Sequence, residues 1–161
     1  MQDIPRVLVV DDEPDNLMWL FDLIHNRGHE VEIAANEQAA RERLQAVKAG
    51  AEHYVLAIID VMVATHDLSA LKTLDGEFFK ISRDTGIRLC QYARLELGLS
   101  DVELPIVCLT IRHDDDVKTA MSELGIQLYV RHDDDSGESI QSLIDQKLGP
   151  LRPAAGAGAE P

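Results

Sequence analysis

Short runs of aliphatic and β-branched residues alternate with longer stretches of helical periodicity along most of this chain. This alternation restricts the fold more than any other feature, because strands that each precede a helix form a parallel sheet with helices on both faces. With 161 residues, 45% of them hydrophobic, the chain can build one domain with a substantial core and hardly two. The predicted strands are residues 6–10, 31–34, 54–59, 106–109 and 126–130.

Residues typical of helix ends mark a helix after each predicted strand. Proline suits a first turn, Asn, Asp and Thr cap free amides, and glycine often follows the last turn. The sequence therefore predicts five strand–helix units. The expected markers are Pro14 and Gly28, Asn36 and Gly50, Asp84 or Thr85 with Gly98, Gly125, and a capping box of Asp135 and Glu138.

One connection is much longer than this pattern requires. Residues 61–83 separate the third strand from its helix, whereas such connections usually have about two to six residues, so we expect an insertion. Leu68, Leu71 and Leu74 recur at helical spacing and predict a helical turn that packs back on the domain. The insertion could serve as a lid, a dimer surface or a docking site for a partner, or only as a self-packed decoration.

The end of the chain differs in composition from the rest. Residues 150–161 consist largely of Ala, Gly and Pro, which cannot bury enough surface to offset the entropy lost on ordering. We therefore expect a disordered tail or a linker there, and a single domain over residues 4–149.

Three acidic residues stand where predicted strands end. Asp11 and Asp12 follow the apolar run 7–10, and Asp60 ends the run 55–59. The carboxyl ends of parallel strands open onto the crevice where ligands bind, so we expect the three carboxylates to meet there. Three such groups repel one another unless a cation or a proton joins them. Oxygen ligands suit Mg²⁺, which keeps several waters and usually shares its coordination with a phosphate.

The balance of charge makes nucleic acid and membranes unfavourable partners. The chain has 15 basic and 29 acidic residues, a net charge of −14, so its surface as a whole repels polyanions and anionic lipids. No apolar stretch approaches the roughly 20 residues that span a bilayer, and the N-terminus has no signal core. We therefore expect a cytoplasmic protein that binds neither nucleic acid nor membranes.

Two further patterns suggest metal binding, but a simpler interpretation is available for each. The runs 113–116 and 132–135 each combine one His with three Asp, and both residue types bind metals. Each run precedes a predicted helix, where acidic side chains cap amides and complement the helix dipole, so we interpret both as helix starts. Cys90 and Cys108 lack the paired spacing of a zinc site, and we expect two buried, reduced thiols.

The acidic residues also stand in a recognisable sequence context. Residues 7–14 read Val-Leu-Val-Val-Asp-Asp-Glu-Pro, Asp60 follows a second hydrophobic strand, and Leu109-Thr110 end another. Together they resemble the receiver domain of bacterial response regulators, over residues 4–149 apart from the insertion. The resemblance implies a flavodoxin-like (βα)5 fold, an α/β doubly wound parallel sheet with strand order 2-1-3-4-5. It also implies two-component signalling, in which a histidine kinase or a phosphotransfer protein passes phosphate to an aspartate.

The resemblance assigns roles by position. Asp60 would be the phosphoacceptor, and Thr110 the switch hydroxyl that moves toward the phosphoryl group. Mg²⁺ would be bound by Asp11, Asp12, Asp60 and the backbone carbonyl of Met62. Such a domain is not an enzyme beyond its own Mg²⁺-dependent phosphorylation and slow dephosphorylation. It would signal through a downstream protein target, and it could also form a homodimer.

The chain departs from the family after the fifth predicted strand. Receivers carry a lysine there, whereas this segment reads Tyr129-Val130-Arg131-His132-Asp133. Arg131 is the expected replacement, with His132 as the alternative, but a flat guanidinium does not fill the place of an ammonium group. Tyr129 is a candidate for the switch aromatic that follows the movement of Thr110, unless it only packs.

These features lead to two signalling hypotheses and one enzymatic one. The first is a receiver phosphorylated on Asp60, slowly and with a long-lived product, because the bulky Ile111 shields the phosphate. The second is a pseudo-receiver, an interaction module that works without phosphorylation. A phosphatase of the haloacid-dehalogenase type is less compatible with the sequence. It needs an aspartate two residues after Asp11, where this chain has Glu13 followed by the helix-starting Pro14.

Overall fold

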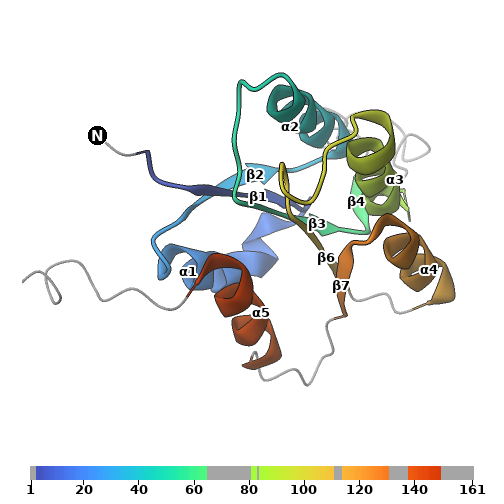
Figure 1. Ribbon diagram of the computed structural model, residues 1–161. Helices are drawn as coiled ribbons and strands as arrows, with labels where there is room; N and C mark the ends of the chain where they lie inside the picture. Colours follow the sequence, from blue (N-terminus) through green and yellow to red (C-terminus); the bar gives the residue numbers. More distant parts are fainter. Residues whose placement is uncertain (1–2, 65–80, 83, 111–113, 131–137, 150–161) are drawn as a thin grey trace, which may run out of the picture.

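The computed structural model has one central sheet of five parallel strands with helices on both faces (Figure 1). It describes residues 3–64, 81–82, 84–110, 114–130 and 138–149. The strands lie in the order β2-β1-β3-β6-β7, which is the predicted order 2-1-3-4-5 of the five central strands. The α/β doubly wound fold is therefore confirmed. The central strands are β1 (Arg6–Val10), β2 (Glu30–Ala34), β3 (Leu56–Asp60), β6 (Ile106–Thr110) and β7 (Gln127–Val130).

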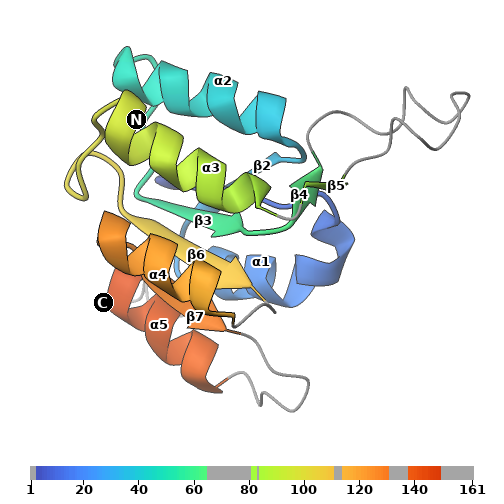
Figure 2. The same cartoon turned by 90° about the vertical axis from the view of Figure 1, so that its right-hand side faces the viewer.

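The helices divide between the two faces of the sheet. Helices α1 and α5 cover one face, and α2, α3 and α4 cover the other (Figures 1 and 2). The helical segments are η1 (Pro14–Leu17), α1 (Met18–His25), α2 (Glu37–Lys48), α3 (Thr85–Gln91), its π-helical continuation η4 (Tyr92–Glu96), α4 (Asp115–Leu124) and α5 (Glu138–Leu148). In the part of the chain that the structure describes, no helix combines the length and the apolar character needed to cross a membrane.

The sheet separates two hydrophobic clusters. Successive side chains of a strand point to opposite faces. In β3, Leu56 and Ile58 therefore pack toward α1 and α5, whereas Ala57 and Ile59 pack toward α2, α3 and α4. A central strand that is buried on both faces has no polar side, which explains why β3 and β6 read as continuous apolar runs in the sequence.

Several predicted helix ends are confirmed by their capping contacts. The Asn36 side chain accepts a hydrogen bond of 2.8 Å from the Ala39 amide at the start of α2. Asp114 accepts one of 3.2 Å from the Val117 amide at the start of α4, as expected for a helix start rather than a metal site. Gly125 ends α4 with φ of 66°, a left-handed conformation that glycine adopts without strain. Helix α5 begins at Glu138, and Asp135, the other member of the predicted capping box, lies outside the described residues.

The third strand begins later than the sequence predicts. Tyr54 is fully buried, but it precedes β3, which begins at Leu56. Its hydroxyl donates to the Glu32 carboxylate, and the Arg6 guanidinium lies 5.2 Å from the centre of its ring. The ring is thus buried beside β1 and β2 although Tyr54 is not part of β3. An apolar residue next to a strand therefore need not belong to that strand.

The two ends of the predicted insertion lie side by side. Strand β4 (Val63–Ala64) pairs antiparallel with β5 (Ile81–Ser82), and Figure 2 shows this ribbon beyond the end of β3, next to the start of α3. Val61 and Val63 are fully buried in the cluster under α2, α3 and α4, so the first residues of the long connection belong to the core. The predicted helical turn at residues 68–74 lies outside the described residues.

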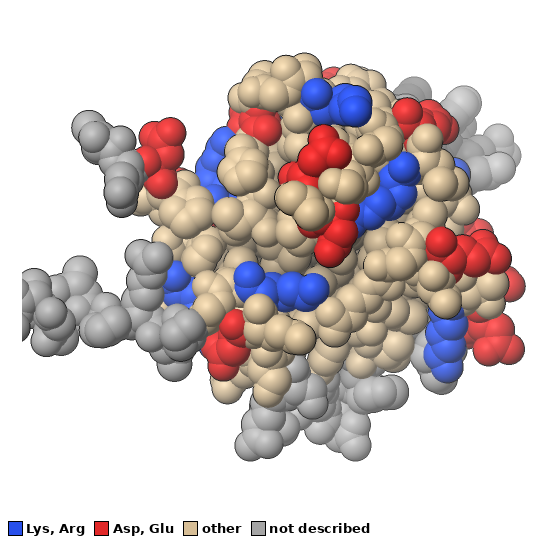
Figure 3. Space-filling view, in the orientation of Figure 1, with Lys and Arg blue, Asp and Glu red and all other residues tan. Residues whose placement is uncertain are grey.

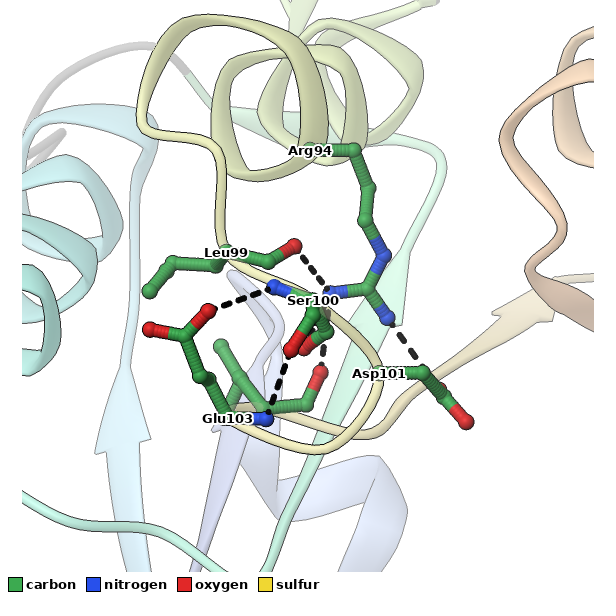
Figure 4. A network of polar contacts seen from close by, with 6 residues as sticks. Arg94, Leu99, Ser100, Asp101 and Glu103 are labelled. Atoms are coloured by element: carbon green, nitrogen blue, oxygen red, sulfur yellow. Dashed lines mark hydrogen bonds and ion pairs between the residues drawn. The ribbon is translucent and has the colours of Figure 1, made fainter.

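One arginine holds the connection between α3 and β6 in place (Figure 4). A π-helical turn ends α3, where the Leu97 amide donates to the carbonyl of Tyr92, five residues earlier, at 2.9 Å. The guanidinium of Arg94 then donates to the carbonyls of Leu99 (3.0 Å), Ser100 (3.2 Å) and Leu104 (2.9 Å), and it forms an ion pair of 3.3 Å with Asp101. The loop therefore depends on a side chain that is only 10% exposed.

Replacing Arg94 by Met should lower the free energy of unfolding by about 3 kcal/mol, because carbonyls in a partly buried loop lose their donor. Asp101→Ala removes only the exposed end of the network and should cost less than about 1 kcal/mol. Urea denaturation of both variants measures the two values. Equal losses would show that the exposed ion pair, and not the three carbonyl contacts, holds the loop.

Candidate functional site

Asp11 and Asp60 are neighbours at the carboxyl end of the sheet. Strand β1 pairs with β3 so that Val10 lies opposite Ile59, and the next residues on the two strands are Asp11 and Asp60. The Asp11 amide continues the sheet by donating to the Ala34 carbonyl of β2 at 3.1 Å. Asp11 is 8% exposed, so one of the two carboxylates is almost fully buried.

Burial and acidic neighbours together change the ionisation of Asp60. Removal from water is the main cause that raises its pKa from 3.8 to about 7. The charge of Asp11, a side-chain hydrogen bond with Asp11, and the charge of Asp12 raise this pKa further, while the Met62 amide opposes the shift. Asp11 therefore interacts with Asp60 through its charge and through a side-chain hydrogen bond, whereas Asp12 acts on Asp60 through its charge alone.

Local backbone turns fix the direction of both carboxylates. Oδ1 of Asp60 accepts a hydrogen bond of 3.1 Å from the Met62 amide, and Oδ1 of Asp11 accepts one of 2.7 Å from the Glu13 amide. In each case the donor lies two residues after the aspartate, so the strand end itself holds the side chain. A side-chain hydrogen bond also joins the two carboxyl groups to each other.

The donor set fits a hard divalent cation only in part. Among the residues that the structure describes, no three His, Cys, Asp or Glu side chains are close enough together to hold a metal ion. Asp11 and Asp60 nevertheless supply oxygen ligands, and the acidic charge that raises the pKa of Asp60 is the charge that Mg²⁺ would neutralise. The pair could thus anchor Mg²⁺ if water, phosphate and backbone oxygens completed its coordination. The roles of Asp12 and of the Met62 carbonyl as ligands stay predictions.

Thr110 lies one strand away from the acidic pair. Leu109 of β6 pairs with Asp60, and Thr110 is the next residue, 2% exposed at the end of the strand. By alternation Thr110 continues the face of Cys108, toward α3 and α4. Its position next to the end of β3 is the one expected of a hydroxyl that responds to a group on Asp60.

Tyr129 lies on the other face of the sheet. It pairs with Leu109, and its ring packs partly buried in the cluster under α1 and α5. Thr110 and the partly buried Leu128 belong by alternation to the opposite face. The structure therefore gives no support to Tyr129 as the aromatic residue behind Thr110.

Some predicted residues cannot be compared with the structure. Arg131 and its alternative His132 lie outside the described residues, as does Ile111. The expected thiols agree with the structure, since Cys90 and Cys108 are unbridged and fully buried, and burial raises the pKa of both.

The sequence analysis missed Gly86, in the first turn of α3. Its amide donates to the Val61 carbonyl at 2.8 Å, directly after the end of β3. A side chain at this position would collide with the backbone of Asp60. A signal was present, because glycine disfavours the interior of a helix and its presence there indicates a reason of packing or function.

Asp60→Asn should reveal the cost of the buried charge. A pKa raised from 3.8 to about 7 means that the folded protein binds the proton more tightly than the unfolded chain, so stability falls as the pH rises from about 4 to 7. Without Mg²⁺, the variant should exceed the wild type by on the order of 3 kcal/mol at pH 8 and should match it below pH 4.

Chemical denaturation of the wild type and of the variant across this pH range measures the difference. A difference between wild type and Asp60→Asn that does not vary with pH would contradict the assignment.

Comparison with solved structures finds proteins of the same fold, whereas comparison of the sequence finds no match. No family model matches the chain, and no curated protein matches it either. A response regulator receiver domain protein from Methanospirillum hungatei superposes with a TM-score of 0.60 at 20% identity, over 91% of this chain and 94% of that one. A two-component response regulator from Clostridium difficile gives 0.60 at 17% identity, over 89% and 95%.

Response regulator TrrA from Thermotoga maritima, in complex with Mg²⁺ and a beryllium fluoride, gives 0.59 at 19% identity, over 90% of this chain and 100% of that one. The protein thus has the fold of response-regulator receiver domains.

Proposed function

We propose that this protein is a receiver of a two-component system or phosphorelay. It accepts phosphate from a histidine kinase or a phosphotransfer protein on Asp60, with Mg²⁺, and signals through a partner protein. The observation that carries the proposal is the pair of neighbouring carboxyl groups, the buried Asp11 and the partly buried Asp60, at the carboxyl edge of a sheet with the receiver strand order. Such a pair favours binding of a cation and of the phosphoryl group that the cation accompanies.

The contacts of Asp60 indicate which of its oxygens reacts. Oδ1 is occupied by the Met62 amide, so we assign Oδ2 as the nucleophile. In the transfer, a bond forms between this oxygen and phosphorus while the phosphorus–nitrogen bond of the donor's phosphohistidine breaks. Mg²⁺ would neutralise the incoming phosphoryl oxygens, and positioning supplies most of the remaining catalysis. Asp11 and Asp60 would hold the metal, with Asp12 and the Met62 carbonyl as the further predicted ligands.

Thr110 would transmit the change to the surface. An acyl phosphate on Asp60 adds negative charge and strong acceptor oxygens. A buried hydroxyl at the end of β6 can donate to these oxygens, and β6 is followed along the chain by α4. Arg131, in place of the family lysine, would contact the phosphate less effectively than an ammonium group, so we expect slow phosphorylation.

The alternative is a pseudo-receiver that binds its partner without phosphorylation. One feature favours it: burial and the neighbouring acids raise the pKa of Asp60 to about 7, which favours the protonated carboxyl in the absence of metal, and a protonated carboxyl is a poor nucleophile. The absence of the usual lysine points the same way. In either case we expect a protein partner, with a homodimer as a further assembly, and no nucleic acid. On the face drawn in Figure 3, basic and acidic side chains are interspersed and form no continuous basic surface.

Incubation with Mg²⁺ and acetyl phosphate should add one phosphoryl group to Asp60, detected by intact-protein mass spectrometry. Asp60→Asn should abolish the adduct, and Asp11→Asn should slow its formation about tenfold or more, because the metal loses a ligand. Asp15→Asn is the matched control, an exposed acid in η1 whose loss should change nothing. Robust reversible labelling excludes the pseudo-receiver, whereas no adduct and no response to beryllofluoride at millimolar donor would defeat the receiver proposal.

Thr110→Val should separate signal transmission from binding. The substitution keeps the shape of a fully buried side chain and removes its hydroxyl, so beryllofluoride should still bind, but the changes it causes in α4 should disappear. Thr110→Ser keeps the hydroxyl and should retain them. Amide chemical shifts of α4 with and without beryllofluoride measure this, and identical responses of wild type and Thr110→Val would remove Thr110 from the mechanism.

A further inference from the structure

We propose that Gly86 is a positioning residue for Asp60. It lies in the first turn of α3, and its backbone sets the orientation of the peptide group whose amide donates to the Asp60 carboxylate. This inference rests on the proposed function only for its consequence in phosphoryl binding. The structural relation between Gly86 and Asp60 stands independently and can be tested without any ligand.

A chain of two hydrogen bonds passes through a single peptide group. The Gly86 amide donates to the Val61 carbonyl at 2.8 Å. The amide nitrogen joined to that carbonyl belongs to Met62, and it donates to Oδ1 of Asp60 at 3.1 Å. Because a peptide group is planar, its carbonyl and its amide turn together. Fixing the Val61 carbonyl therefore fixes the direction of the Met62 amide, and hydrogen bonds in such a chain also polarise and strengthen one another.

The close approach of the two backbones is possible only for glycine. A Cβ atom on Gly86 would lie 2.1 Å from the Asp60 carbonyl oxygen and 2.5 Å from Cα of Val61. Both are backbone atoms at the end of a central strand, so they cannot turn aside as a flexible side chain would. Residue 86 must be glycine because there is no space for a side chain, and not because its backbone is in a left-handed conformation.

An outward shift of α3 would expose residues that are buried on both sides of Gly86. Thr85 is fully buried and Ile87 is 8% exposed on either side of Gly86. On the facing segment, Val61 and Val63 are fully buried in the same cluster. We therefore expect a side chain at residue 86 to displace the segment 60–62, whose backbone it would meet and which carries the carboxylate.

The test compares Gly86→Ala with Ile87→Ala. The second variant also damages the buried start of α3 but leaves the contact with Val61 unchanged, so it controls for loss of stability. Two quantities are measured in each folded variant: the chemical shift of the Met62 amide proton, which reports its hydrogen bond to Asp60, and the affinity for beryllofluoride with Mg²⁺, followed by the fluorescence of Trp19, the single tryptophan.

Gly86→Ala should shift the Met62 amide proton upfield and should weaken beryllofluoride binding about tenfold or more, because a small displacement of a reacting group has a large effect. Ile87→Ala should leave the amide shift unchanged and the affinity within about twofold of the wild type. An unchanged Met62 shift in Gly86→Ala, or an equal change in Ile87→Ala, would overturn the inference. Failure of the wild type to bind beryllofluoride would count against the proposed function instead, and the amide shift would still decide on Gly86.

Should Gly86→Ala fail to fold, an amide-to-ester replacement at residue 86 removes the donor without adding a side chain. It should move the Met62 amide shift in the same direction. No movement in the ester variant would show that the Val61–Gly86 hydrogen bond does not position Asp60, and would overturn the inference.

Discussion

The parallel pairing of β1 with β3 is the constraint on which the rest of the site depends. Once Val10 lies opposite Ile59, the chain places Asp11 beside Asp60 at a sheet edge where Asp11 is buried and Asp60 is partly buried. Burial, and to a smaller extent the charge of Asp11, makes ionisation of Asp60 unfavourable, and the pKa of Asp60 rises to about 7. The raised pKa of Asp60 is thus a consequence of the sheet register, which places Asp11 beside it.

Backbone amides hold the Asp11 and Asp60 carboxyl groups in place. The Met62 and Glu13 amides each hold one carboxylate oxygen, and the Gly86 amide holds the peptide group from which the Met62 amide points. Helix α3 is therefore more than a cover for the sheet, because its first turn contacts the strand end that carries Asp60. The two-stranded ribbon of β4 and β5 belongs to the connection between Val61 and the start of α3.

Some features of the site could be predicted because they depend on local patterns and on one general property of parallel sheets. Because aspartates stand at the ends of two strands of a parallel sheet, the sequence predicts that Asp11 and Asp60 lie close together. The capping chemistry of Asn36 likewise predicts the start of α2. The face occupied by Tyr129 could not be predicted in this way, since a change of one residue in strand register reverses it. Tyr54 misled the strand prediction because a ring can be buried by side-chain contacts alone.

The sequence by itself determined the alternation of strands and helices, the strand ends at which the acids stand, and the helix starts at residues such as Asn36 and Asp114. These features follow from periodicity and from contacts within a few residues. Only the tertiary structure decided that Asp60 interacts with Asp11, that Thr110 and Tyr129 lie on opposite faces of the sheet, and that Gly86 lies against the Asp60 backbone. The reason is physical: such contacts join residues far apart in the chain, and their distances depend on how the helices pack on the sheet.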